Sequence, residues 1–597
     1  MALCNLFAFL VFFLPFLLVA EPLKPQAEIF QRSLPLRVDL GYEIYEGFYN
    51  DTSKLNEYKG MRYAASTEGK NRWQPPQSPE QNRGSVIPAT QWPQRCPQGP
   101  QAPDPGPTFN FTGTEDCLFL SVFAAPDAHN LPVMIWIHGG GYGGGQGNQY
   151  LSTLMGNNSN AFVGVVIQYR LGAFGFLGGD EVHRFGTNNA GLLDQHYALE
   201  WVQKYIHLFG GDKTRVTIAG ESAGAGSVML QAMAYGGSEG TRYFQNIIAA
   251  SPYLPMQYGY SDWQPSQAYY AFALTAGCFD GRMYGNASQT LFDCLVGKDS
   301  ITLQNASYIV GGSGTFGTWA FLPVTDGDFI PDRPSRQLTT GKLNGLRIMS
   351  GNNANEGVGF TIQNITTETA FEDWVRLQLP LFSEEEIQSV LDHYPSTSAD
   401  VDPSYPRFAS TGTSPPYVLN VSSFGTGQQQ RANNLYSETT FVCPSYWLAQ
   451  GFKEAYKYQY SVPASQHGAD LYGEGLRAAT PNEAPQFQKA FMRMWGNFIV
   501  HNDPSISSEL ANGNGSKAFN PASQWPRFSR QKPSMINLNE TGGVEFEARV
   551  VAGTPNVTEY EGPGLQNDIT LQNAWTWEAG RGFRCDFWRE LGVKVPE

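Results

Sequence analysis

Short apolar runs rich in β-branched residues alternate along this chain with segments of helical periodicity, and this alternation limits the fold more than any other feature. Continuous apolar runs predict strands covered on both faces, as in a parallel sheet with helices above and below it. Strands that alternate with helices indicate a doubly wound α/β architecture. The predicted strands are 133–137, 163–169, 216–219, 346–350 and 456–462, and the predicted helices are 192–204, 222–235 and 485–500.

The composition predicts one large folded domain and argues against nucleic-acid binding. Of the 597 residues, 16% are charged and 41% are hydrophobic, so the chain can bury a sizeable core and is not intrinsically disordered. The 39 basic and 54 acidic residues give a net charge of −15, which repels phosphate backbones. Because no repeat and no convincing linker divides the chain, we expect a single domain over residues 21–597.

The first twenty residues predict export. Residues 6–19 are almost wholly apolar and are followed by the small residue Ala20, as in a signal peptide over residues 1–20. An uncleaved membrane anchor is the alternative, but the run is shorter than the ~20 residues of a spanning helix and contains Pro15. No later segment is long and apolar enough to span a bilayer. We therefore expect a secreted, extracellular protein without stable membrane insertion.

Cysteines and glycosylation sequons agree with export. Six cysteines remain after residue 20, which suggests three disulfides, although spacing alone allows fifteen pairings. Ten Asn-x-Ser/Thr sequons predict N-linked glycans. The sequons are at Asn50, Asn110, Asn157, Asn286, Asn305, Asn364, Asn420, Asn514, Asn539 and Asn556.

A Gly-x-Ser-x-Gly turn between a predicted strand and a predicted helix marks Ser222 as a candidate nucleophile. In such a turn the serine occupies a strained position, and the two glycines let the chains pass without Cβ clashes. The hydroxyl then projects near the positive end of the following helix. The segment 236–240 matches the same pattern but follows a helix, so it is interpreted as a helix-stopping loop. A structural turn serine is the alternative role for Ser222.

The glycines of 139–141 follow the predicted strand 133–137 and predict an oxyanion hole. Consecutive glycines let backbone N–H groups approach the oxygen on which negative charge develops in acyl transfer. The same glycines also fit a dinucleotide-binding fingerprint, which needs an acidic residue about 20 positions later for the ribose. Because there is no Asp or Glu from Gly139 to Gly179, the sequence argues against a nucleotide site.

The general base is expected after Ser222 with an acid between the two, because enzymes with this strand–turn–helix place nucleophile, acid and histidine in that order. His393 lies in a helical LDHYP segment, and His501 ends a predicted helix, where a cation interacts favourably with the helix dipole. His467 lies in a loop after the predicted strand 456–462, and catalytic residues often occupy such loops. The sequence favours His467, with a structural loop histidine as the alternative.

The acid must orient the imidazole and stabilise its charged form. Glu356 is the one carboxylate in the loop 351–357 after the predicted strand 346–350. Asp326 and Asp328 are competitors, but they precede that strand in a turn-like Asp-Gly-Asp-Phe. The sequence favours Glu356, for which a helix N-cap or a surface acid is the alternative role.

Several longer motifs surround these residues. They are GMRYA (60–64), RWQPPQ (72–77), EDCLFLSV (115–122), IHGGGY (137–142), YRLGAFGFL (169–177), NAGLLDQHYALEWV (189–202), GESAGAGS (220–227), GNNANEG (351–357), HGAD (467–470) and CDFW (585–588). With them the chain resembles the type-B carboxylesterase/lipase family, which includes cholinesterases and some fungal lipases, and is closest in pattern to secreted fungal carboxylesterases. The resemblance implies an α/β-hydrolase fold with a doubly wound, mostly parallel central sheet and helices on both faces.

The resemblance also implies roles for individual residues. The family's Ser-Glu-His triad falls on Ser222, Glu356 and His467. The oxyanion donors fall on the backbone N–H groups of Gly140, Gly141 and Ala223. The implied disulfides are Cys96–Cys117, Cys278–Cys294 and Cys443–Cys585, and no metal or cofactor is implied.

Two departures from the family narrow the expected function. The loop 97–116 holds five prolines, which argues against the amphipathic lid helix of the family's lipases, and it lacks the tryptophan that stacks on choline in cholinesterases. We therefore expect a serine carboxylesterase that hydrolyses short-to-medium acyl esters through an acyl-enzyme. The alternatives are a lipase acting on triglycerides and a non-catalytic, cholinesterase-like adhesion protein. The sequence predicts no oligomeric state.

Overall fold

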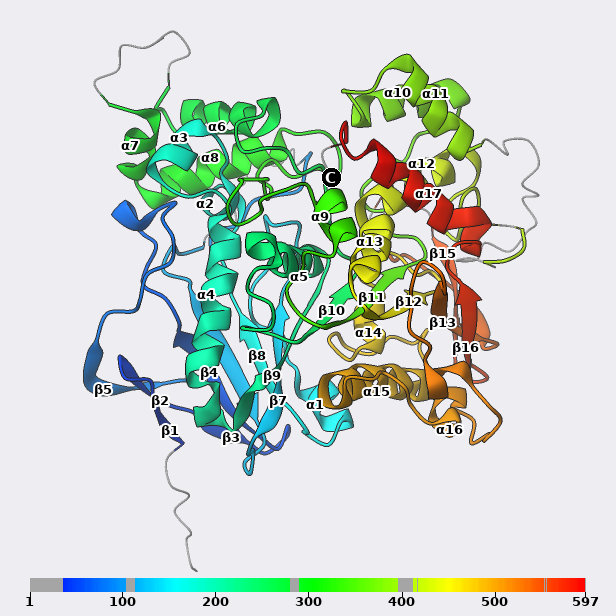
Figure 1. Ribbon diagram of the computed structural model, residues 1–597, viewed down its shortest axis with the longest axis horizontal. Coiled ribbons are helices and arrows are strands. Elements are labelled where there is room, and N and C mark those ends of the chain that lie inside the picture. Colours follow the sequence, from blue (N-terminus) through cyan, green and yellow to red (C-terminus); the bar gives the residue numbers. More distant parts are fainter. Residues whose placement is uncertain are drawn as a thin grey trace, which may run out of the picture. The chain divides into compact units, whose positions relative to one another are not determined.

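An eleven-stranded mixed sheet is the centre of the computed structural model (Figure 1). Its strands are β3 (Phe48–Asn50), β4 (Leu55–Arg62), β6 (Phe119–Ala124), β7 (Leu131–Ile137), β8 (Val163–Ile167), β9 (Gly211–Glu221), β10 (Asn246–Ala250), β11 (Arg347–Asn353), β12 (Glu454–Tyr460), β13 (Ser534–Thr541) and β16 (Gln566–Asn573). They follow the order β16-β13-β12-β11-β10-β9-β7-β8-β6-β4-β3. The strands from β13 to β8 run parallel, and the edge strands pair antiparallel with their neighbours.

The structure describes residues 36–103, 113–279, 289–395, 412–415, 417–551, 553–554 and 556–595. The predicted signal peptide, the sequons at Asn110 and Asn286 and residues 104–112 of the proline-rich loop lie outside these ranges. Residues 36–597 group into one compact unit. In the described ranges no helix has the length and apolar character needed to cross a membrane.

Helices cover both faces of the sheet because alternate residues of a strand point to opposite sides. In β7, Val133, Ile135 and Ile137 join one hydrophobic cluster, and Met134 and Trp136 join another. The helices are α1 (Ser152–Asn157), α2 (Gly172–Phe176), α3 (Asp180–Phe185), α4 (Ala190–Tyr205), α5 (Ala223–Met233), α6 (Trp263–Thr275), α7 (Leu291–Val296), α8 (Ser300–Gly312), α9 (Pro334–Thr340), α10 (Glu368–Gln378), α11 (Glu384–His393), α12 (Gly427–Ser437), α13 (Cys443–Gly451), α14 (Asp470–Gly473), α15 (Pro485–His501), α16 (Ser508–Asn512) and α17 (Trp577–Leu591). Helices α4, α5 and α13 pack in the first cluster and α1 and α15 in the second, as expected for a doubly wound fold.

Small elements complete the fold. A three-stranded sheet contains β1 (Arg37–Asp39), β2 (Glu43–Glu46) and β5 (Asn82–Pro88), and a hairpin is formed by β14 (Val544–Ala548) and β15 (Val557–Glu561). In Figure 1, α6, α7 and α8 gather in one part of the molecule, and α10 and α11 in another.

The predicted doubly wound, mostly parallel α/β sheet is confirmed. The five predicted strands correspond to β7, β8, β9, β11 and β12, and the three predicted helices to α4, α5 and α15. The structure adds β10 between β9 and β11, and it adds both edges of the sheet. Strand β9 begins at Gly211, earlier than predicted, because its first half is polar and largely exposed and does not resemble a buried strand.

The carboxyl ends of neighbouring parallel strands position the candidate site. Parallel strands end at the same edge of a sheet, where ligand sites of open α/β folds lie. Ser222 follows β9 directly, Ser251 follows β10, Glu356 follows β11 and His467 lies in the loop after β12. Residues far apart in the sequence therefore meet at one edge.

The structure contains the three disulfides that the resemblance implied. Cys443–Cys585 joins α13 to α17, and Cys278–Cys294 joins the end of α6 to α7. Cys96–Cys117 closes the loop that contains the proline-rich segment.

Candidate active site

Ser222 lies at the sharp turn between β9 and α5, with a backbone φ of 59° and ψ of −127°. Few non-glycine residues adopt a positive φ, so the surrounding structure must enforce this turn. A Cβ added to Gly220 would lie 2.4 Å from the Gly224 carbonyl carbon, and one added to Gly224 would lie 2.1 Å from the Ile137 carbonyl oxygen. Both glycines of the motif are therefore required by close backbone packing.

The structure brings Ser222, His467 and Glu356 into one hydrogen-bonded chain. The Ser222 Oγ lies 2.8 Å from His467 Nε2, and His467 Nδ1 lies 2.5 Å from Glu356 Oε2. With the Nδ1–H donating to the carboxylate, Nε2 is left to accept the proton of the serine hydroxyl. This geometry can activate an alcohol as a nucleophile.

Glu356 is fully buried, and donors from two strand ends hold its carboxylate. Its Oε1 accepts hydrogen bonds from Ser251 Oγ at 2.6 Å and from the Asn353 backbone N–H at 2.5 Å. These donors offset part of the unfavourable burial of a charge and leave Oε2 for His467. Ser251 was not among the predicted site residues because it follows β10, a strand that the sequence did not predict.

A second carboxylate, Glu221, lies beside His467. Its Oε1 is 3.3 Å from His467 Nε2, and its side chain is largely buried. Burial of the His467 ring lowers its pKa, but the charges of Glu221 and Glu356 outweigh burial and raise this pKa above 6.5. Burial also raises the pKa of Glu221. Two acids therefore favour the imidazolium that forms when His467 takes a proton.

Backbone N–H groups next to Ser222 are available for an oxygen anion. Gly140 and Gly141 have φ values of 108° and 62°, and Ala223 is the first residue of α5, where N–H groups lack intrahelical acceptors. None of these three N–H groups has a hydrogen-bond acceptor among the described residues. Unpaired donors at such a site can stabilise negative charge that develops on a carbonyl oxygen.

The segment after Cys96 supports the glycine loop. The Gln98 Oε1 accepts a hydrogen bond from the Gly145 N–H at 2.8 Å, and the Gly99 N–H donates to the Gly143 carbonyl at 2.7 Å. The first disulfide therefore anchors a segment that fixes the loop carrying Gly140 and Gly141.

A cavity of about 220 Å³ opens over Ser222. Trp319 forms part of its wall, and a Cβ added to Gly141 would lie 2.0 Å from the indole ring. The ring centroids of Phe360 and Phe441 lie 5.2 Å and 4.2 Å from the centroid of the His467 ring, so both rings cover part of the imidazole.

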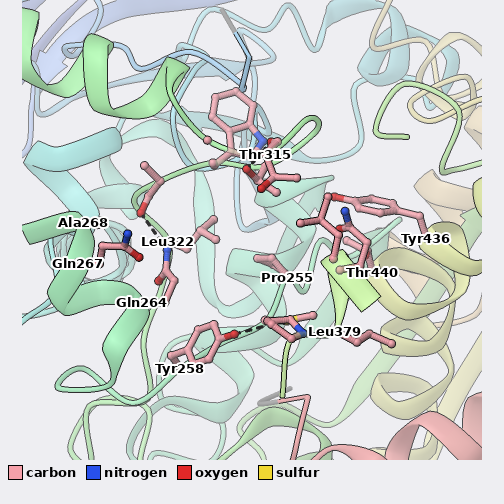
Figure 2. Close-up of a pocket in the computed structure, with 18 of the residues that line it drawn as sticks. Pro255, Tyr258, Gln264, Gln267, Ala268, Thr315, Leu322, Leu379, Tyr436 and Thr440 are labelled. Carbon is pink, nitrogen blue, oxygen red and sulfur yellow. Dashed lines mark hydrogen bonds between the residues drawn. The ribbon is translucent and has the colours of Figure 1, made fainter. Parts of the chain in front are cut away.

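A larger cavity of about 470 Å³ shares Tyr253 and Trp319 with the cavity over Ser222. Figure 2 shows apolar Pro255, Leu322 and Leu379 among its lining residues, together with polar Gln264 and Thr440. These residues come from α6, from the segments after β10, α8 and α10, and from residues 438–442 after α12.

Comparisons with known proteins identify the family. Residues 44–551 match the model described as the carboxylesterase family. The chain belongs to this family. Carboxylesterase patB of Aspergillus clavatus is 31% identical over 500 residues, which cover 75% of this chain and 84% of that protein. A secreted lipase of Arthroderma benhamiae is 34% identical over 501 residues, which cover 79% of this chain and 84% of that protein.

A solved structure supports the fold. The crystal structure of Aspergillus niger EstA is similar with a TM-score of 0.71 and 23% identity, and the match covers 94% of this chain and 99% of that chain. The protein thus has the predicted α/β-hydrolase fold, and it is a carboxylic ester hydrolase.

The alternative candidates for the base, the acid and the nucleophile motif lie away from Ser222. His393 ends α11 and stacks on Phe587, and His501 ends α15. Asp326 is held in its own turn by the Ile330 and Asp328 N–H groups. The second Gly-x-Ser-x-Gly segment follows α5, with Gly236 and Gly237 at positive φ as in a helix-ending loop.

Three residues close to Ser222 and His467 were not predicted from the sequence. Glu221 had a local signal, because it immediately precedes Ser222 in the motif. Trp319 and Arg477 line the cavity over Ser222 but come from segments without a motif, so only the folded structure reveals them.

Proposed function

We propose that this protein is a secreted serine carboxylesterase in which Ser222 is the nucleophile, His467 the general base and Glu356 the orienting acid. Ser222 attacks the ester carbonyl while His467 takes its proton, and the N–H groups of Gly140, Gly141 and Ala223 stabilise the oxyanion. His467 then protonates the leaving alcohol, and water releases the acid from the acyl-enzyme. The hydrogen-bonded chain from Ser222 through His467 to Glu356 carries this proposal.

Replacement of the nucleophile tests the mechanism. We expect Ser222→Ala to lower kcat on p-nitrophenyl butyrate by at least about 10⁴-fold, because the acyl-enzyme can no longer form. An organophosphate should label the wild-type protein at Ser222 and leave the folded variant unlabelled. A folded wild-type protein that never labels would favour the non-catalytic adhesion class.

The small cavity over Ser222 supports a preference for short-to-medium acyl esters. Its volume of about 220 Å³ lies below the ~300–1,000 Å³ of drug-sized ligand sites. Turnover of p-nitrophenyl esters should therefore fall as the acyl chain lengthens from four to sixteen carbons. Fastest turnover of the longest esters would contradict this preference.

The adjoining cavity favours a lipase as the second candidate. Trp263 and Leu377, which line it, are 51% and 60% exposed, and apolar side chains at a cavity mouth suit contact with a lipid surface. A lipase would gain activity on a triglyceride when the substrate concentration passes its solubility limit. A simple saturation curve through that limit supports the esterase.

Secretion and glycosylation belong to the same proposal. Three disulfides suit an oxidising compartment, and one relative carries the name secreted lipase. Asn364, Asn514 and Asn556 are exposed, whereas Asn420 is 7% exposed. Because a glycan needs an accessible asparagine, peptide mapping of the secreted protein should find glycans at the first three sites and an unmodified Asn420.

A further inference from the structure

Arg477 contributes a cation to the cavity over Ser222. It lines this cavity together with His467, Gly468 and Glu221. Its side chain is exposed, and among the described residues its guanidinium forms no hydrogen bond or salt bridge, although its charge acts on Glu221 and partly offsets the rise that burial causes in the pKa of that carboxylate. Its Cζ lies 5.6 Å from the centroid of the Tyr472 ring. A guanidinium with free N–H groups matches the geometry of a carboxylate.

Arg477 lies beside the residue that follows His467, and from this we expect it on the leaving-alcohol side of the cavity. A Cβ added to Gly468 would lie 3.7 Å from both terminal guanidinium nitrogens of Arg477. Gly468 directly follows His467, which gives its proton to the leaving alcohol in the proposed mechanism. A group on that alcohol is therefore the part of the substrate nearest to Arg477.

The neighbouring carboxylate does not pair with Arg477. The same Cβ at Gly468 would lie 3.3 Å from Glu221 Oε1, yet no Arg477 nitrogen comes within 4.0 Å of a Glu221 oxygen. Glu221 instead lies 3.3 Å from His467 Nε2. Its carboxylate therefore lies against the imidazole, and Arg477, which acts on it only across more than 4.0 Å, keeps its guanidinium N–H groups for a ligand.

We propose that Arg477 is a specificity-determining residue that selects esters whose leaving alcohol carries a carboxylate. This inference rests on the proposed role of Ser222 and His467, and it adds the chemical class of the substrate. The carboxylate would accept two N–H bonds from the guanidinium while the ester carbonyl reaches Ser222.

The test compares two esters that differ in charge but little in shape, 3-carboxyphenyl butyrate and 3-carbamoylphenyl butyrate. The kcat/KM of each is divided by its rate of hydroxide-catalysed hydrolysis to remove differences in leaving-group reactivity. Wild type should prefer the carboxylate ester by about fivefold or more. This is the preference expected from a charge pair that is exposed to solvent or partly buried. High salt should reduce the preference.

Variants of Arg477 should change this ratio in order of charge and geometry. Arg477→Gln should bring it to about one, Arg477→Lys should keep part of it because lysine lacks the planar fork, and Arg477→Glu should invert it. Arg336→Gln on α9 is the matched control, because Arg336 is exposed but does not line the cavity, and its ratio should equal that of wild type. Near-ultraviolet circular dichroism verifies the fold of each variant.

Three results would overturn the inference. One is a wild-type ratio near one on an enzyme that hydrolyses the carbamoyl ester well. Another is an equal loss on both esters in Arg477→Gln, which would mean that Arg477 acts through Glu221 and His467. The third is a preference for phenyl hydrogen glutarate over phenyl glutaramate that exceeds the preference on the alcohol side. Failure of wild type to hydrolyse either butyrate would instead refute the proposed function itself.

Discussion

His467 is placed between two carboxylates that act on it differently. Glu356 receives the Nδ1–H and is fixed by Ser251 and Asn353, so it determines the orientation of the ring. Glu221 approaches Nε2, the nitrogen that also faces Ser222 Oγ, so it mainly favours the charged ring by its electrostatic field. The first acid should therefore affect geometry and charge, and the second mostly charge.

The role of Glu221 predicts a shift in the pH dependence of activity. Because a general base must be neutral, activity is lost as the pH falls through the His467 pKa, which lies above 6.5. Glu221→Gln removes one source of this elevation, so the acidic limb of kcat/KM on a neutral ester should move to lower pH by about one unit. Glu561→Gln, a carboxylate outside the cavity, is the control. An unmoved limb, or one displaced to higher pH, would contradict the assignment.

The position of Trp319 predicts that this side chain limits the length of the acyl chain that the enzyme prefers. Its side chain lines both the cavity over Ser222 and the larger one, so we expect Trp319→Ala to join them. The ratio of kcat/KM for p-nitrophenyl laurate to that for the butyrate should rise roughly tenfold, as expected if about two further CH₂ groups become buried at about 0.8 kcal/mol each. Trp263→Ala is the matched control, because Trp263 lines only the larger cavity. Equal ratios in both variants would show that the indole is not a partition.

At the scale of elements, the disulfide Cys443–Cys585 connects α13 and α17, which pack against each other, and α13 also packs against β11 and β12 of the sheet. Both cysteines are fully buried, and the bond closes 142 residues of chain, compared with 16 for Cys278–Cys294. In the chain-entropy account a longer loop restricts the unfolded chain more.

Removal of each disulfide should therefore have unequal effects. Cys443→Ser with Cys585→Ser should lower the free energy of unfolding by about 4–5 kcal/mol, and Cys278→Ser with Cys294→Ser by about 3 kcal/mol. Denaturant midpoints of the two double variants measure the order. The reverse order would show that local packing, and not loop length, decides the contribution.

The elements also show why some parts of this protein are predictable from sequence. Strands β7 and β8 are short runs of apolar, mostly β-branched residues covered on both faces, so their periodicity is informative. The edge strand β16, QNDITLQN, is mostly polar and lacks this pattern, and β10, NIIAA, has only two β-branched residues. Ser222, Glu356 and His467 were predicted because each lies just after a recognisable strand. Ser251, Trp319 and Arg477 were not, because their proximity arises only from tertiary packing.

At the scale of the whole molecule, several buried acids make the folded state more stable at low pH, whereas the active site needs a higher pH for activity. Burial raises the pKa of Asp470, Glu483 and Glu559 to about 7 and that of Glu540 to about 8. Glu438 is the opposite case, because the charges of Arg584 and Arg581 outweigh its burial and lower its pKa. The first four acids make the folded state more stable at acidic pH. Glu438 limits this effect, because its protonation at very low pH would destabilise the folded state.

This contrast predicts that stability and activity change in opposite directions. Between pH 4 and 8 the folded protein keeps protons on these four acids that the unfolded chain has released, so the stability they contribute is lost as the pH rises through 7 to 8. The Tm at constant ionic strength should be several degrees higher at pH 5 than at pH 8, while activity is greater at pH 8. Glu540→Gln should reduce the difference in Tm. A Tm that increases towards pH 8 would contradict this account.

The order in which strand ends supply the site has a consequence for biosynthesis. The residues that surround the nucleophile follow β9, β10, β11 and β12, four adjacent strands whose segments leave the ribosome one after another. A nascent chain that has not yet delivered residue 467 into the sheet holds a serine without its base. Esterase activity should therefore appear late in folding and in a single step. The ribosome and the transport machinery would then not meet a partly assembled active site.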